Sequence, residues 1–232
     1  MTAGWTEFAV AFLAFTGSHF LPRIGGLRET LMTRLGRRWY FTAYGAMSLL
    51  VLIWLVGAAS RAPYVELWPP LPWTRYVPAI AMPIAIFFAV AGIETPSPFT
   101  LGSKRGTVFD PGTPGLAALT RHPLLWALTF WSVSHLPPNG DLAHVLLFGG
   151  FAVMSLGAML IFDQRARHAQ PDEATARLFL AAPILSPLAL LSPAWLRVNG
   201  LPFAKRLLIA AAVWLAALAL HLPVIGVSPA VG

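Results

Sequence analysis

Histidine is the residue type with the most scope for chemistry in this chain, because cysteine is absent and acidic residues number nine. An imidazole inside an apolar stretch is costly unless it has a partner. Two of the six histidines, His19 and His135, lie near the ends of long apolar stretches. With no thiolate and few carboxylates, a metal would be held by imidazole nitrogen. His19 and His135 are therefore the candidate metal ligands.

The neighbours of these two histidines indicate which metal centre they could serve. Phe8, Phe12 and Phe15 share a helix face with His19, and Trp131 lies one turn before His135. Such an aromatic stripe could line a flat apolar cofactor, or it could be an ordinary packing face. Histidines from two helices of a membrane bundle commonly hold a haem iron.

Arginines near the first histidine could serve the same cofactor. Arg23 and Arg28 follow His19 closely and could pair with haem propionates. The alternative is that both arginines only set membrane topology.

A third histidine, His122, stands in an Arg-His-Pro motif at the entrance of a predicted helix. Helix N-termini favour anions, so Arg121 and His122 are candidates for contact with an anionic cofactor group or a lipid headgroup. His122 and His135 would lie about 140° apart around one helix and roughly 20 Å apart along it, so they cannot share one metal ion.

The remaining histidines have plainer interpretations. His168 lies in a charged stretch that we expect to be a solvated loop. His221 is expected at the membrane interface beside Pro223, and His144 opens an apolar run.

The elements that carry these residues must lie in a membrane. Hydrophobic residues make up 57% of the 232-residue chain, charged residues 11%, and mean hydropathy is +0.68. A soluble domain carries roughly 25% charged residues, so this chain cannot cover a water-facing surface. The net charge of +7 does not indicate nucleic acid, because the basic residues flank apolar runs.

Six apolar runs are long enough to cross a bilayer, which needs about 20 residues per helix. They are Trp5–Leu21, Trp39–Ala59, Val77–Ile93, Leu116–Leu136, Leu142–Phe162 and Leu207–Val224. A further stretch, Leu178–Leu196, contains three prolines and is predicted to be re-entrant or to lie in the interface. The link from Arg23 to Arg38 could form a short basic interfacial helix. The predicted fold is an all-α membrane bundle in a single domain over residues 1–232.

The basic residues predict the topology. All 16 lysines and arginines except Arg61 and Arg75 fall in the links after the first, third and fifth runs or around the proline-rich segment. By the positive-inside rule these links are cytoplasmic and both termini lie outside. The first residues lack the basic region of a secretory signal, so we expect them to remain in the mature chain.

Three segments together resemble a known family. They are Phe15–Leu50, Thr120–Asp141 and Phe162–His168, and their combination is similar to the NnrU family of integral membrane proteins. The resemblance implies a bacterial inner-membrane protein associated with denitrification, where the family is linked to nitrite and nitric oxide reduction.

The same pattern is similar to plant zeta-carotene isomerase, a distant relative that holds haem b. Its ligand histidines match His19 and His135, and its Arg-His-Pro matches Arg121–Pro123. Where that enzyme has a cysteine proposed as an alternative ligand, this chain has Ser132, and a hydroxyl is a poor substitute for thiolate. The resemblance therefore implies haem without the ligand switch. Because the predicted spans place His19 toward the inner side and His135 toward the outer side, His122 is the alternative partner of His19.

These observations leave several functions open. The first is a haem-b membrane protein in denitrification or membrane redox chemistry, with the bilayer and a redox partner or apolar small molecule as partners. The alternatives are a haem-dependent cis–trans isomerase of a carotenoid-like polyene, and a membrane methyltransferase using S-adenosylmethionine, because Arg-His-Pro also occurs in isoprenylcysteine methyltransferases. The last candidate function is a structural role without a cofactor.

Overall fold

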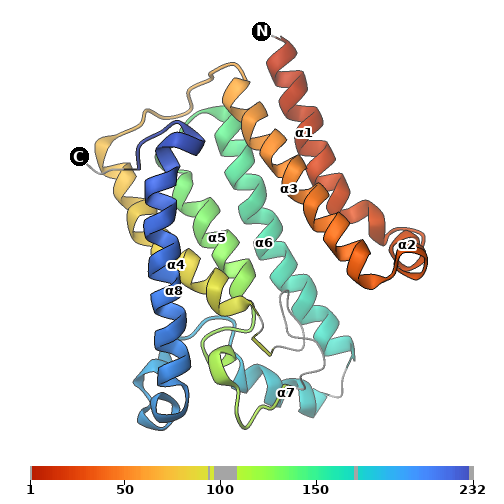
Figure 1. The fold of residues 1–232 in the computed structure, drawn as a ribbon, viewed down its shortest axis with the longest axis vertical. Helices are drawn as coiled ribbons and strands as arrows, with labels where there is room; N and C mark the ends of the chain where they lie inside the picture. Colours follow the sequence, from red (N-terminus) through yellow and green to blue (C-terminus); the bar gives the residue numbers. More distant parts are fainter. Residues whose placement is uncertain (1, 94, 97–108, 170–171, 230–232) are drawn as a thin grey trace. The chain divides into compact units, whose positions relative to one another are not determined.

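The computed structural model describes residues 2–93, 95–96, 109–169 and 172–229, without the side chains of residues 2, 23, 172 and 174. Within these residues the regular structure is helical, and the two paired residues Glu66 and Asp141 form only an isolated bridge (Figure 1). The predicted all-α fold is confirmed.

Eight α-helices and four short 3-10 turns follow one another in the described residues. They are α1 Thr2–Phe20, η1 Leu21–Arg23, α2 Leu27–Leu35, α3 Arg37–Arg61, η2 Pro72–Arg75, α4 Tyr76–Gly92, η3 Gly115–Ala118, α5 Pro123–His135, α6 Leu142–Ala169, α7 Asp172–Ala181, η4 Leu188–Leu191 and α8 Pro193–Ile225.

Four helical segments are long and apolar enough to cross a membrane: Arg37–Arg61, Pro72–Gly92, Leu142–Ala169 and Pro193–Ile225. They correspond to four of the six predicted runs. The first predicted run forms α1, which is 19 residues long but carries Glu7 and His19. The chain is thus a multi-pass membrane protein, and the predicted number of about six spans is approximate.

The predicted run Leu116–Leu136 is not one continuous helix. Residues 116–118 form part of η3, residues 119–122 are not helical, and α5 begins at Pro123. Proline has no N–H to donate, and the residue before it is pushed out of the helical region, so the helix starts there. At 13 residues, α5 is about 20 Å long, short of the roughly 30 Å apolar core of a bilayer.

The chain divides into two compact units. Unit 1 comprises Met1–Pro69 and Asn139–Leu147. In it α1 packs along α3, and a Cβ atom on Gly4 would lie 2.8 Å from the Arg61 carbonyl oxygen. The guanidinium of Arg61 pairs with Glu7 at 2.6 Å. Both contacts align the start of α1 with the end of α3.

A close backbone approach fixes the start of α6 within unit 1. The carbonyl oxygen of Gly140 accepts hydrogen bonds from the amides of Leu67 and Trp68, at 2.8 and 3.2 Å. Leu142 donates its amide to Val65 at 2.9 Å. A Cβ atom on Gly140 would lie 2.0 Å from the Trp68 carbonyl oxygen, so only glycine fits there.

Unit 2 comprises Pro70–Pro138 and Phe148–Gly232. In it α4 packs against α5 and α8, around a core that includes Phe87, Phe88, Ala127 and Ala210. The rings of Phe88 and Phe130 stack with centroids 5.9 Å apart. This core holds α5 although the helix is short.

The proline-rich segment is divided among three structures. Its start is the end of α7, its centre is a non-helical stretch around Pro183 and Pro187 followed by η4, and its end is the first turn of α8, where Pro193 follows the N-cap Ser192. The last predicted run forms the second half of α8, which has 33 residues.

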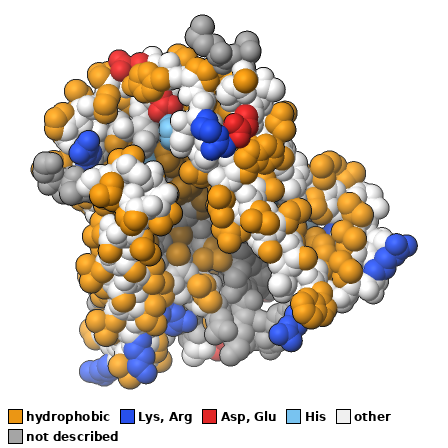
Figure 2. Space-filling view, turned by 45° about the horizontal axis from the view of Figure 1, so that its top comes forward, with side chains coloured by type: hydrophobic (Ala, Val, Ile, Leu, Met, Phe, Trp, Pro, Cys, Tyr) orange, Lys and Arg blue, Asp and Glu red, His pale blue; other side chains and the backbone are white. Residues whose placement is uncertain are grey.

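Figure 2 shows hydrophobic side chains over most of the face in view, with lysines and arginines in separate small groups. Leu208, Leu215 and Val224 of α8 are more than half exposed. An apolar exterior of this kind suits lipid rather than water.

Candidate functional site

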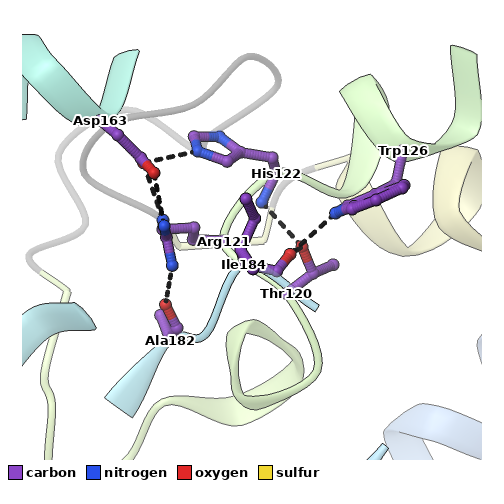
Figure 3. Close-up of polar contacts among 7 residues, drawn as sticks. All are labelled: Thr120, Arg121, His122, Trp126, Asp163, Ala182 and Ile184. Carbon is purple, nitrogen blue, oxygen red and sulfur yellow. Dashed lines mark hydrogen bonds and ion pairs between the residues drawn. The ribbon is translucent and has the colours of Figure 1, made fainter. Parts of the chain in front are cut away.

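A buried ionic cluster joins α5, α6 and the non-helical stretch after α7, all within unit 2 (Figure 3). Asp163 of α6 accepts hydrogen bonds from Arg121 Nε at 2.7 Å and from Arg121 Nη2. The same carboxylate accepts a hydrogen bond from His122 Nε2 at 2.8 Å. The exposed fractions of the side chains are 10% for Arg121, 13% for Asp163 and zero for His122.

The cluster also orders the chain before α5. Thr120 Oγ1 donates to the Ile184 carbonyl oxygen and accepts from the His122 amide at 3.0 Å. The indole of Trp126 donates to the same Ile184 oxygen at 2.8 Å. Arg121 Nη1 donates to Ala182 at 3.2 Å. Side chains thereby provide hydrogen-bond partners for backbone carbonyl and amide groups that lie outside the helices.

Backbone hydrogen bonds complete this junction. The Arg121 amide donates to Pro183 at 2.9 Å, and the Ser186 amide donates to Leu119 at 2.8 Å. Two segments more than 60 residues apart in sequence are therefore joined by two backbone hydrogen bonds.

Aromatic rings cover the charged groups. The ring of Phe162 stacks on His122 with centroids 6.4 Å apart. The guanidinium carbons of Arg121 and Arg167 lie 4.5 and 4.6 Å from the ring centroid of Phe179. Cation–π contacts at this distance are favourable, and the carboxylate compensates the Arg121 charge. A compensated ion pair of this kind is tolerated beside apolar helices.

His19 has a well-defined ring orientation in unit 1. Its Nδ1 lies 2.8 Å from the carbonyl oxygen of Phe15, one turn earlier, and Ser18 Oγ donates to the same oxygen at 2.7 Å. A carbonyl only accepts, so Nδ1 carries the hydrogen, and Nε2 holds the lone pair when the ring is neutral. The Phe15 ring lies 4.5 Å away and the Tyr44 ring of α3 lies 6.0 Å away, centroid to centroid.

His135 has the same local arrangement in unit 2. Its Nδ1 lies 2.6 Å from the carbonyl oxygen of Trp131, and Ser134 Oγ donates to that oxygen at 3.1 Å. The imidazole stacks on Phe148 of α6 with centroids 5.1 Å apart. Nδ1 is again the protonated nitrogen, for the same reason as in His19.

The shared arrangement is an aromatic residue at i−4, a serine at i−1 and a histidine in the last turn of its helix. His168 also has Nδ1 2.7 Å from a carbonyl oxygen four residues earlier, but that residue is Gln164 and the side chain is exposed. The tautomer alone therefore does not distinguish His19 and His135, whereas their aromatic and half-buried setting does.

The predicted arginines lie in different settings. Arg23 ends η1, and its side chain lies outside the described residues. Arg28 lies on α2, with its guanidinium carbon 5.6 Å from the Phe41 ring centroid. Arg121 and His122 bind Asp163, so the anion beside them is a carboxylate of the chain itself. Their contact with a cofactor stays a prediction.

His19 and His135 belong to different units. Their pairing on one iron, and the alternative pairing of His19 with His122, therefore also stay predictions. Within the described residues no group of three or more His, Asp or Glu side chains gathers as a metal site, although an axially ligated haem needs only two.

The main residue that sequence reasoning missed is Asp163. It lies in one of the three segments that carry the family resemblance, at the charged end of an apolar run. That position could have indicated that Asp163 binds a basic residue, because an acidic residue beside a membrane helix needs a partner. The prediction that His168 lies in a loop is wrong: α6 continues to Ala169, because the residues after Asp163 are mostly good helix formers.

One comparison with known proteins bears on the whole molecule: the NnrU protein family matches residues 7–229. The chain belongs to the NnrU family. The match runs through both compact units, and the family resemblance seen in the sequence is thereby confirmed. Neither a curated protein nor a solved structure matches this NnrU protein.

Proposed function

We propose that this NnrU protein binds haem b in the membrane, with His19 and His135 as iron ligands, and takes part in the redox chemistry of denitrification. The observation that supports the proposal is the shared setting of the two imidazoles. In each, the Nδ1–H is donated to a carbonyl one turn earlier, which leaves Nε2 as the nitrogen with a lone pair. Metal-bound histidines commonly have this arrangement, because the second bond fixes the tautomer and the ring plane.

The donor set suits haem better than a small metal ion. Two neutral imidazoles are enough protein ligands for a haem iron, whereas structural zinc is bound by four protein ligands. The rings beside the histidines, Phe15 and Tyr44 for His19 and Trp131 and Phe148 for His135, are apolar surfaces of the kind that pack against a porphyrin. When bound, haem supplies one-electron transfer, and the chain's part is to orient the imidazoles and exclude water.

The other candidate functions have less support in the geometry. Ser132, which stands where the plant isomerase has cysteine, is buried and donates to the Leu128 carbonyl at 2.7 Å. Its hydroxyl is thus hydrogen-bonded to a backbone carbonyl of its own helix. In the Arg-His-Pro motif considered for S-adenosylmethionine, Arg121 and His122 bind Asp163.

A haem assay on three single variants tests the proposal. Protein purified from haem-replete membranes is expected to show a Soret band and a pyridine haemochrome spectrum of haem b. His19→Ala and His135→Ala each remove one ligand nitrogen, so we expect most of the bound haem to be lost in each variant.

The matched control is His168→Ala, because His168 has the same Nδ1 bond in an exposed place. We expect its haem content to stay at the wild-type level. A Soret band that persists in both the His19 and the His135 variants would refute the ligand assignment. A wild-type protein that carries no haem would refute the proposal as a whole.

A further inference from the structure

A second group of charged side chains, in unit 1, is not among the proposed iron ligands. It lies in the link between α1 and α3, which α2 occupies, and in the first turn of α3 (Figure 1). Arg34 and Arg38 are exposed, Arg28 and Arg37 lie beside one aromatic ring, and Glu29 is the one acidic residue of the link. The link therefore has a clear positive balance.

Two of these arginines converge on Phe41. The guanidinium carbon of Arg28 lies 5.6 Å from the ring centroid, and that of Arg37 lies 5.3 Å from it. Arg28 comes from α2 and Arg37 from the first turn of α3. Among the residues that the structure describes, neither forms an ion pair with a carboxylate. Two like charges are thus held on one ring without an acidic partner.

Apolar side chains close to these arginines in the sequence are exposed. Ile24 is 66% exposed, Leu27 47% and Trp39 69%. No residue of α2 is buried. A short helix with exposed leucines and arginines lies well in the plane of a bilayer interface.

The place of Phe41 along α3 sets the depth of the two charges. Arg37 opens the candidate span Arg37–Arg61, and Phe41 lies one turn further in. The two guanidiniums therefore lie at the boundary between the apolar core and the headgroups, where phosphates lie. Arginine presents a fork of donors that matches phosphate oxygens.

We propose that Arg28 and Arg37, aligned by Phe41, bind the phosphate of an anionic phospholipid at the start of α3. The lipid phosphate compensates the positive charge of the pair, while the exposed Ile24 and Leu27 contact its acyl chains and glycerol. A cluster of arginines beside a membrane helix recognises anionic lipid in this way.

Native mass spectrometry of the full chain tests the proposal. Protein in detergent is mixed with equal amounts of phosphatidylglycerol and phosphatidylcholine, and the retained lipids are counted. We expect phosphatidylglycerol to be retained preferentially. In R28Q/R37Q its retention should fall by about tenfold or more, since each arginine near a lipid surface contributes roughly fivefold in affinity.

The matched control is R34Q/R38Q, which removes the same charge from the same link but leaves the Phe41 pair intact. We expect its retention to fall by about threefold at most, from weaker long-range attraction. Phe41→Leu changes no charge, and its expected loss of retention would show that alignment by the ring matters. Gel filtration and circular dichroism establish that each variant is folded.

Three outcomes would overturn the proposal. Equal losses in the two double variants would show that net charge alone attracts lipid. Equal retention of the two lipids by the wild type would remove the anionic preference. A drop in haem content in R28Q/R37Q with unchanged phosphatidylglycerol retention would assign the arginines to a haem propionate.

Discussion

At the scale of single residues, Asp163 is the acidic centre of the buried ionic cluster. It accepts hydrogen bonds from Arg121 and His122. Arg121 also donates to the Ala182 carbonyl, and the neighbouring Thr120 donates to the Ile184 carbonyl. A buried pair of opposite charges adds little stability by itself, but removing one member leaves an uncompensated charge. The cluster is therefore a point at which a single substitution should have a large effect.

Asp163→Asn tests this role. The amide cannot compensate the Arg121 guanidinium, so we expect the free energy of unfolding to fall by about 3 kcal/mol or more. Thermal unfolding in detergent measures the change. Asp110→Asn is the matched control, since Asp110 is exposed and its contacts are to the nearby Gly112 and Thr113. If both variants melt together with the wild type, the cluster does not stabilise the junction.

At the scale of elements, the starts of α5 and α6 are positioned by hydrogen bonds from a small number of residues. The start of α6 depends on the bonds between Gly140 and residues 67–68, and the start of α5 depends on Thr120, Arg121 and the stretch after α7. Helix α5 is too short to be placed by the bilayer alone, so packing against α4 and hydrogen bonds at its N-terminus must position it.

Gly140→Ala tests the first junction. The added methyl would lie 2.0 Å from the Trp68 carbonyl oxygen, so the backbone must shift, and a loss of roughly 1–3 kcal/mol is expected. Gly149→Ala in α6 is the control, because no atom would lie within 4 Å of its added methyl and alanine favours a helix. In thermal unfolding we expect Gly140→Ala to melt below the wild type. Gly149→Ala should melt at the wild-type temperature or above it. The argument fails if Gly140→Ala is as stable as Gly149→Ala.

At the scale of the whole molecule, the apolar helices and the family match describe a multi-pass membrane protein. From the positive-inside rule we expect the α1–α3 link to lie in the cytoplasm and the C-terminus to lie outside. We expect this orientation in the bacterial inner membrane.

The absence of cysteine makes the orientation testable by labelling. Thr33→Cys and Val227→Cys each introduce one thiol at an exposed position, on α2 and after α8 respectively. A membrane-impermeant maleimide should label the Val227 variant in intact spheroplasts and the Thr33 variant only after permeabilisation. The reverse pattern would invert the topology, and labelling of both positions in intact spheroplasts would require an even number of spans between them.

The sequence by itself determined the helical class, the membrane location and the family. Hydropathy is a local and additive property, so apolar runs predict the helices without knowledge of their neighbours. The local setting of the two Ser-His pairs is likewise a short-range property, because the carbonyl that each imidazole contacts is only four residues away. Only the tertiary structure decided that Arg121 and His122 meet Asp163, some 41 to 42 positions later in the chain. A buried polar group is satisfied by whichever partner the packing brings to it, and no periodicity in the sequence encodes that choice.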